Sequence, residues 1–117
     1  MPTKKTTRGE EIAALNDRFR ASLVGAPGIP GRWVMTRGVA TLGPALVAEV
    51  VRRVQTFATF TPDNDPHGER DFGRFALDDG TAILWKIDYY ESAALDYGAE
   101  DARTCYRVLV VMLADEY

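Results

Sequence analysis

Residues 61–73, with the sequence TPDNDPHGERDFG, hold the densest group of side chains that could do chemistry in this chain. The group consists of Asp63, Asp65, His67, Glu69 and Asp71. The acids and Gly68 follow the spacing of a calcium-binding EF-hand loop, but the twelfth position, which needs a bidentate glutamate, is Arg74. An EF-hand is therefore excluded. A hard divalent ion held weakly by two of Asp63, Asp65, Glu69 and Asp71 stays open, and no other cofactor is expected.

The simpler interpretation of this segment is structural, and we prefer it. Asp and Asn side chains stabilise turns by accepting hydrogen bonds from the backbone two residues on, and prolines fix the direction of the chain. Phenylalanines bracket the segment on both sides and are expected to pin it to the core. The acidic loop is then either architecture or a partner surface.

The other residue types that carry catalysis do not assemble into a recognised set. His67 and Cys105 are the only histidine and cysteine, which excludes a zinc site, and Cys105 lies in an apolar run typical of a core position. Neither serine lies in a nucleophile motif. Lys86 is preceded by Leu84 where a metal-dependent nuclease needs an acid. No catalytic residue is predicted.

A second candidate surface comes from the stretch WKIDYY. Lys86, Asp88 and Tyr90 alternate with core-like residues, so they are predicted to project together from one face of a strand. A solvated Lys–Asp pair accounts for this pattern. The alternative is a partner-binding face, because tyrosine supplies rigid contact area with a polar tip. We expect the acidic loop to line one end of this face.

Composition limits the classes of partner. The chain has 117 residues and a net charge of −3, and three of its basic residues lie in the first eight positions, so residues 9–117 carry 11 basic and 17 acidic side chains. An acidic body argues against nucleic acid. The longest apolar run, residues 108–114, is too short to span a membrane. With no secretory signal and one cysteine, a cytoplasmic location is expected.

The order of elements predicts an α+β fold, with two helices packed on one face of a small, mainly antiparallel sheet. Residues 1–8 are expected to be a disordered basic arm and residues 9–117 a single domain. Helices are predicted from Glu10 to about Leu23 and from Pro44 to about Phe60, with a strand at residues 32–39 between them. Asp79-Gly80 predicts a two-residue hairpin between the next two strands. The last strand, residues 105–113, is apolar on both faces and is therefore central or covered by a second subunit.

Four blocks in this order, LNDRFR, FTPDNDPHGERDFG, WKIDYY and RVLVVMLADEY, resemble a bacterial family known as domain of unknown function 3768. The resemblance runs from about Leu15 to Tyr117. It implies a small protein of alphaproteobacteria and their mobile elements, and it brings no activity with it. The loop of the family typically has a tyrosine and a histidine where this chain has His67 and Arg70, so the histidine is displaced here.

These observations predict a non-enzymatic, cytoplasmic protein-interaction module that binds a protein partner through the acidic loop and the Lys86/Asp88/Tyr90 face. The resemblance adds the setting of an inhibitor or accessory factor in a conflict involving a mobile element. The alternative is a small divalent-metal-dependent hydrolase or nucleic-acid-processing enzyme that uses carboxylates of the loop. A homo-oligomer formed through residues 105–113 is a third hypothesis.

Overall fold

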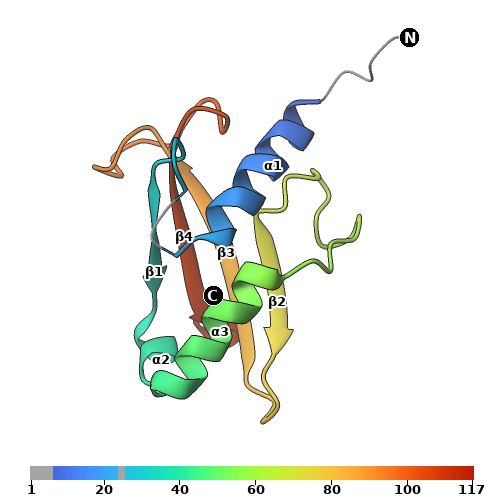
Figure 1. Ribbon diagram of the computed structural model, residues 1–117, viewed down its shortest axis with the longest axis vertical. Coiled ribbons are helices and arrows are strands. Elements are labelled where there is room, and N and C mark those ends of the chain that lie inside the picture. Colours follow the sequence, from blue (N-terminus) through green and yellow to red (C-terminus); the bar gives the residue numbers. More distant parts are fainter. Residues whose placement is uncertain (1–6, 24–25) are drawn as a thin grey trace.

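The computed structural model of this protein describes residues 7–23 and 26–117. Most of the predicted basic arm lies outside the described residues, and the first helix begins at Arg8 after the N-cap residue Thr7. The elements, shown in Figure 1, are α1 (Arg8–Ala21), β1 (Gly31–Met35), α2 (Arg37–Ala40), α3 (Pro44–Thr56), β2 (Phe72–Ala76), β3 (Ala82–Tyr90), β4 (Tyr106–Leu113) and the 3₁₀ helix η1 (Ala114–Glu116).

The four strands form one mixed sheet with the order β1-β4-β3-β2. β2 pairs antiparallel to β3 and β3 antiparallel to β4, but β1 lies parallel to β4. The α+β class is confirmed. The prediction of two helices is wrong in detail, because α2 makes a third, and the sheet contains one parallel pair. Apolar alternation indicates which residues form a strand, but it carries no information on which neighbour that strand pairs with.

Helices α1 and α3 cross one face of the sheet (Figure 1). The core beneath them contains Phe19, Val50 and Val54 from the helices and the alternate strand residues Ile83, Trp85, Ile87, Leu109 and Val111. Phe57 and Phe60 contact Trp85 edge to face, with ring centroids 5.6 and 6.3 Å away. The predicted core face of β3 is therefore confirmed, and burial of these side chains is the main source of stability.

Both long helices end earlier than predicted. α1 ends at Ala21, so Leu23 lies beyond it and is 48% exposed. α3 ends at Thr56, where Phe57 turns into an extended conformation. The guanidinium of Arg20 accounts for this second end, since it donates to the Val54 and Phe57 carbonyl oxygens at 2.6 and 2.9 Å. A side chain from another helix thus caps α3, which periodicity within residues 44–60 does not reveal.

The hairpin between β2 and β3 is confirmed, but its turn differs from the two-residue turn predicted. The Leu77 N–H donates to the Thr81 oxygen, and the Gly80 N–H donates to the Leu77 oxygen. Gly80 has φ +89°, which L side chains rarely adopt. Three residues therefore form the loop, with glycine in the left-handed position that returns the chain to the ladder.

Alternate strand residues face the other side of the sheet, which α1 and α3 do not cover (Figure 1), and η1 contacts β3. We call this the open face. Its strand residues are Arg32, Val34, Phe72, Arg74, Ala76, Ala82, Leu84, Lys86, Asp88, Tyr90, Tyr106, Val108, Val110 and Met112. No helix in the described part of the chain is long and apolar enough to cross a membrane.

Candidate functional site

The acidic loop is held by hydrogen bonds made within it. The Asn64 side chain accepts from the Thr61 N–H at 2.8 Å and donates to the Thr59 oxygen at 3.0 Å, and the Asp65 N–H donates to the Thr61 oxygen. The composition predicted turns held by Asp and Asn side chains, but the pattern differs from the one expected, since Asn64 bonds backbone three and five residues before it and not two residues on. Asp63 and His67 are exposed, whereas Asp65, Glu69 and Asp71 are half-buried. The five predicted site residues are therefore not equally available to a partner.

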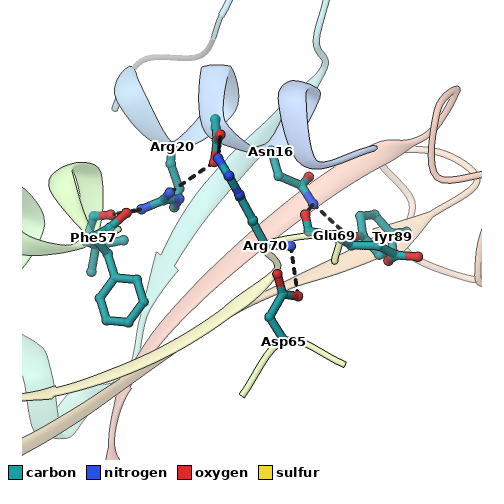
Figure 2. A network of polar contacts seen from close by, with 9 residues as sticks. Asn16, Arg20, Phe57, Asp65, Glu69, Arg70 and Tyr89 are labelled. Carbon is teal, nitrogen blue, oxygen red and sulfur yellow. Dashed lines mark hydrogen bonds and ion pairs between the residues drawn. The ribbon is translucent and has the colours of Figure 1, made fainter. Parts of the chain in front are cut away.

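A chain of charged contacts ties the loop to α1 (Figure 2). An Asp65 carboxylate oxygen accepts from the Arg70 N–H at 3.1 Å, where Arg70 has a left-handed φ of +56°. The Arg70 guanidinium then donates to Asp17 at 2.6 Å, and Asp17 also accepts from Arg20 at 3.1 Å. A left-handed φ costs free energy for any residue other than glycine. Asp65 offsets part of this cost, because its carboxylate accepts the hydrogen bond of the Arg70 N–H.

Asn16 is the centre of a second, buried network. Its side-chain amide donates to the Glu69 oxygen at 3.0 Å and to the Tyr89 hydroxyl at 2.9 Å, and its oxygen accepts from the Arg107 Nε at 2.7 Å. The Tyr89 hydroxyl in turn donates to Asp71 at 3.1 Å. Asn16 is 0% and Arg107 1% exposed. One amide therefore connects α1, the loop, β3 and β4, and Figure 2 shows its contacts with Glu69 and Tyr89.

Burial controls the protonation of this network. Burial raises the pKa of Asp71 and of Glu69, and the neighbouring Asp71 carboxylate raises the Glu69 pKa further. Burial, followed by the charge of Asp71, also raises the pKa of Tyr89 far above its ordinary range. Tyr89 is therefore a neutral hydrogen-bond donor at physiological pH. Its hydroxyl and the Asn16 amide serve to satisfy polar groups inside the fold.

The loop carboxylates do not converge on one point. Within residues 7–23 and 26–117, no group of three or more His, Cys, Asp or Glu side chains is arranged to hold a metal ion. Asp65 and Asp71 already accept hydrogen bonds from Arg70 and Tyr89. Two acids with water remain the most that the loop offers to a hard cation.

Cys105 is buried and unpaired, and burial raises the pKa of its thiol. Its sulfur lies 3.3 Å from an Arg107 Nη nitrogen, and it donates weakly to the Ala102 oxygen. A raised pKa keeps the thiol protonated, which is the property of a core cysteine and not of a nucleophile.

Lys86, Asp88 and Tyr90 lie together on the open face, as predicted. The Lys86 Nζ is 2.9 Å from an Asp88 oxygen, and this hydrogen bond raises the pKa of Lys86. The structure does not bring the acidic loop to this face. The Glu69 carbonyl bonds Asn16, and Asp71 bonds Tyr89. Side chains alternate along β3, so Tyr89 lies on the helix-covered side, opposite to Lys86, Asp88 and Tyr90. The expectation of one continuous site is therefore wrong in geometry.

The open face combines apolar and cationic side chains. Val34 is 38% exposed, and a groove of about 780 Å³ runs beside Phe72, Leu84 and Tyr117. Lys86 is paired with Asp88, whereas Arg32 and Arg74 have no ion pair within the described residues. The strand residues of this face carry three cations and one anion, although the whole chain has a net charge of −3.

Asn16, Arg20 and Arg107 are the polar residues that the sequence analysis missed. All three are less than 4% exposed. Arg107 interrupts an otherwise apolar strand, and Asn16 and Arg20 share the buried side of α1 with Phe19. The sequence did contain an indication of this network, since each of these polar residues occupies a position where the periodic pattern expects an apolar one. A polar side chain at such a position indicates a buried hydrogen bond.

Comparison with known proteins bears on the family alone. The family described as "Protein of unknown function (DUF3768)" matches residues 35–116. This chain belongs to that family. The match covers most of the chain and confirms the resemblance, although it begins at Met35, the last residue of β1, and not near Leu15. No curated protein matches this chain, and no solved structure does.

Proposed function

We propose that this protein of the DUF3768 family is a noncatalytic, cytoplasmic binding module that holds a protein partner on the open face of its sheet, around Lys86, Asp88 and Tyr90. The observation that carries the proposal is the contrast between the two faces. Two helices cover one face (Figure 1), whereas on the other Val34 is exposed and Phe72 and Tyr90 are half-buried. Leu84, Val108 and Met112 of that face are buried beneath their neighbours. Partly exposed apolar and aromatic side chains with a polar rim are typical of interaction sites.

Charge defines the chemistry of the partner. Arg32 and Arg74 flank the apolar centre from the two outer strands, and neither has an acidic neighbour in ion-pair range among the described residues. A partner surface with apolar side chains at its centre and carboxylates at its rim complements this arrangement. A second copy docked face to face would place arginines against arginines. We therefore favour an acidic protein partner over a homo-oligomer.

The position of β4 also bears on self-association. Both edges of β4 are hydrogen-bonded, one to β1 and the other to β3, so residues 105–113 have no free edge for a second subunit. A homo-oligomer through this strand is restricted to its open-face side chains. A module without its own turnover acts by occupying its partner, which is the mode of action of the inhibitor or accessory factor that the family resemblance implies.

Site-specific photo-crosslinking in the cells that carry the gene tests this proposal. A benzophenone amino acid replaces Tyr90 on the open face in one variant and Arg52, exposed on α3, in the matched control. We expect one discrete protein adduct from position 90 and none from position 52, and a weaker adduct when Lys86→Glu is added. No adduct from position 90, or equal adducts from both positions, would refute the proposal. An adduct that contains nucleic acid would also refute it.

A further inference from the structure

β2 is an edge strand, and most of its outer backbone groups have no partner among the described residues. The Asp71 oxygen accepts from the Ile87 N–H, and the Leu77 N–H donates to the Thr81 oxygen. In an antiparallel ladder, alternate residues point their backbone groups to the same neighbour. The odd residues from 71 to 77 therefore bond to β3, and Phe72, Arg74 and Ala76 direct their N–H and C=O groups away from the sheet.

Nearly all of these outward groups lack a partner in the described part of the chain. Arg53 donates to the Ala76 oxygen at 2.7 Å, and this is the only hydrogen bond made to them. The loop that precedes β2 makes no backbone hydrogen bond with Phe72, Arg74 or Ala76. Proteins usually pair, cover or charge such an edge, because it is a template for a further strand.

Open space lies on both sides of this edge. A groove of about 380 Å³ runs on the helix side between Phe75, Arg53 and Phe57. The groove of about 780 Å³ on the open face lies beside Phe72 and Leu84. Arg74 lines both grooves. Since side chains of a strand alternate between faces, a strand added to β2 would find room for its residues on each side.

The charges around the edge select the occupant. Arg74 is exposed and has no ion pair among the described residues, and Arg53 stacks over the Phe75 ring at 4.6 Å with its guanidinium at the groove. Self-pairing of β2 about a two-fold axis at its middle residue would place Arg74 directly opposite Arg74. Like charges directly opposite each other destabilise a strand pair. The edge therefore favours an acidic segment over a second copy.

We infer that β2 captures an extended acidic peptide segment of the protein partner by strand addition, with a carboxylate opposite Arg74 and an apolar side chain in the groove beside Phe75. This inference rests on the proposed function, and it specifies that the bound segment of the partner is extended and acidic. Backbone hydrogen bonds from Phe72, Arg74 and Ala76 supply affinity, and the two grooves supply specificity. Peptide recognition by strand addition to a free edge works in this way.

A library of random linear peptides displayed on phage, selected against the purified full chain, provides the probe. We expect the enriched peptides to carry an acidic residue within an alternating, β-branched sequence. Arg74→Pro removes an outward N–H and places the proline ring at the edge, but it leaves the β2–β3 hydrogen bonds in place. It is expected to lower peptide affinity at least tenfold. Arg74→Glu should do the same with the backbone intact, and Arg52→Ala, exposed on α3, should change affinity less than twofold.

Amide NMR on the labelled chain locates the peptide independently of these variants. Binding should shift the amide signals of Phe72, Arg74 and Ala76 and slow their hydrogen exchange, with smaller changes at Val34 and Val110. Failure to enrich any peptide, or equal binding to Arg74→Pro, overturns the inference. Peptides whose footprint centres on Val34 and Tyr90 also overturn it, but they leave the proposed function standing. Absence of a protein adduct from position 90 would refute the proposed function itself. The crosslinking experiment thus tests the proposed function, and the peptide experiments test strand addition to β2.

Discussion

The acidic loop and the open face are the two regions that the sequence marks as candidate surfaces, and they use their polar groups in opposite ways. In the loop, Asp65 and Asp71 accept hydrogen bonds from Arg70 and Tyr89, and the Glu69 carbonyl accepts from Asn16. On the open face, Arg32 and Arg74 have no ion pair within the described residues. A dense group of charges in a sequence is therefore a poor guide to a binding surface, since a partner needs groups that the fold has not already used.

Two valines on neighbouring strands give the strongest test of the difference between the faces. Val111 is 0% exposed beneath the helices, and Val34 on β1 is 38% exposed on the open face. Val111→Lys is expected to lose at least about 4 kcal/mol of unfolding free energy, since it buries an unpaired charge. Val34→Lys is expected to lose less than about 1 kcal/mol. Urea denaturation of both variants makes the measurement, and equal losses would show that the open face is covered in solution.

The second test concerns the buried network. Asn16→Leu removes the acceptor of the Arg107 Nε and the donor to Tyr89 and the loop, and we expect it to reduce the free energy of unfolding by about 3 kcal/mol. Asp63→Ala is the control, because Asp63 is exposed and makes no hydrogen bond within the described residues; its expected loss is below about 0.5 kcal/mol. A loss below about 1 kcal/mol for Asn16→Leu would contradict a structural role for the network.

The third test uses pH. Burial raises the pKa of Asp71 in the folded state, so its contribution to stability is present below the unfolded pKa and is lost as pH rises through the folded pKa. Hydrogen bonds from Thr36, the Leu113 N–H and the Gly38 N–H lower the pKa of Glu116, so its contribution is present above the unfolded pKa and is lost as pH falls through the folded pKa.

We therefore expect Asp71→Asn and Glu116→Gln to change the pH profile of unfolding in opposite directions. The stability of Asp71→Asn relative to the wild type should increase as pH rises above the raised pKa of Asp71. Glu116→Gln should be close to neutral at low pH and destabilising at pH 7, because Gln keeps the length of the side chain but loses its charge. Thermal melts between about pH 3 and pH 7 decide this, since aspartate and glutamate side chains ordinarily titrate in that range. Parallel profiles would mean that neither carboxyl is linked to folding as described.

The smallest expected effect is that of metal ions. Millimolar magnesium, calcium or manganese should move the melting midpoint by less than about 1 °C in the wild type and in the Asp63→Ala/Asp65→Ala variant, because a ligand stabilises a fold only if it binds the native state. A midpoint that rises in the wild type and not in the variant would establish an ion site in the loop. It would also favour the metal-dependent enzyme over the binding module.

The sequence by itself determined the α+β class, the apolar stripe of α3, the core face of β3 and the turn-forming character of residues 61–65. These features depend on contacts within a few residues: helical periodicity, strand alternation, and Asp and Asn side chains bonded to nearby backbone. The sequence also placed Lys86, Asp88 and Tyr90 on one face, because strand alternation alone requires it.

Only the tertiary structure decided which strands are neighbours, where α3 ends and which charges remain free. The parallel pairing of β1 with β4, the Arg20 cap on α3 and the Asn16 network join residues that lie 34 to 91 positions apart. Asn16 and Asp17 of α1 also bond Glu69 and Arg70 of the loop, on the face opposite Lys86. No local pattern encodes such contacts, because each depends on where distant elements come together once the apolar surface is buried.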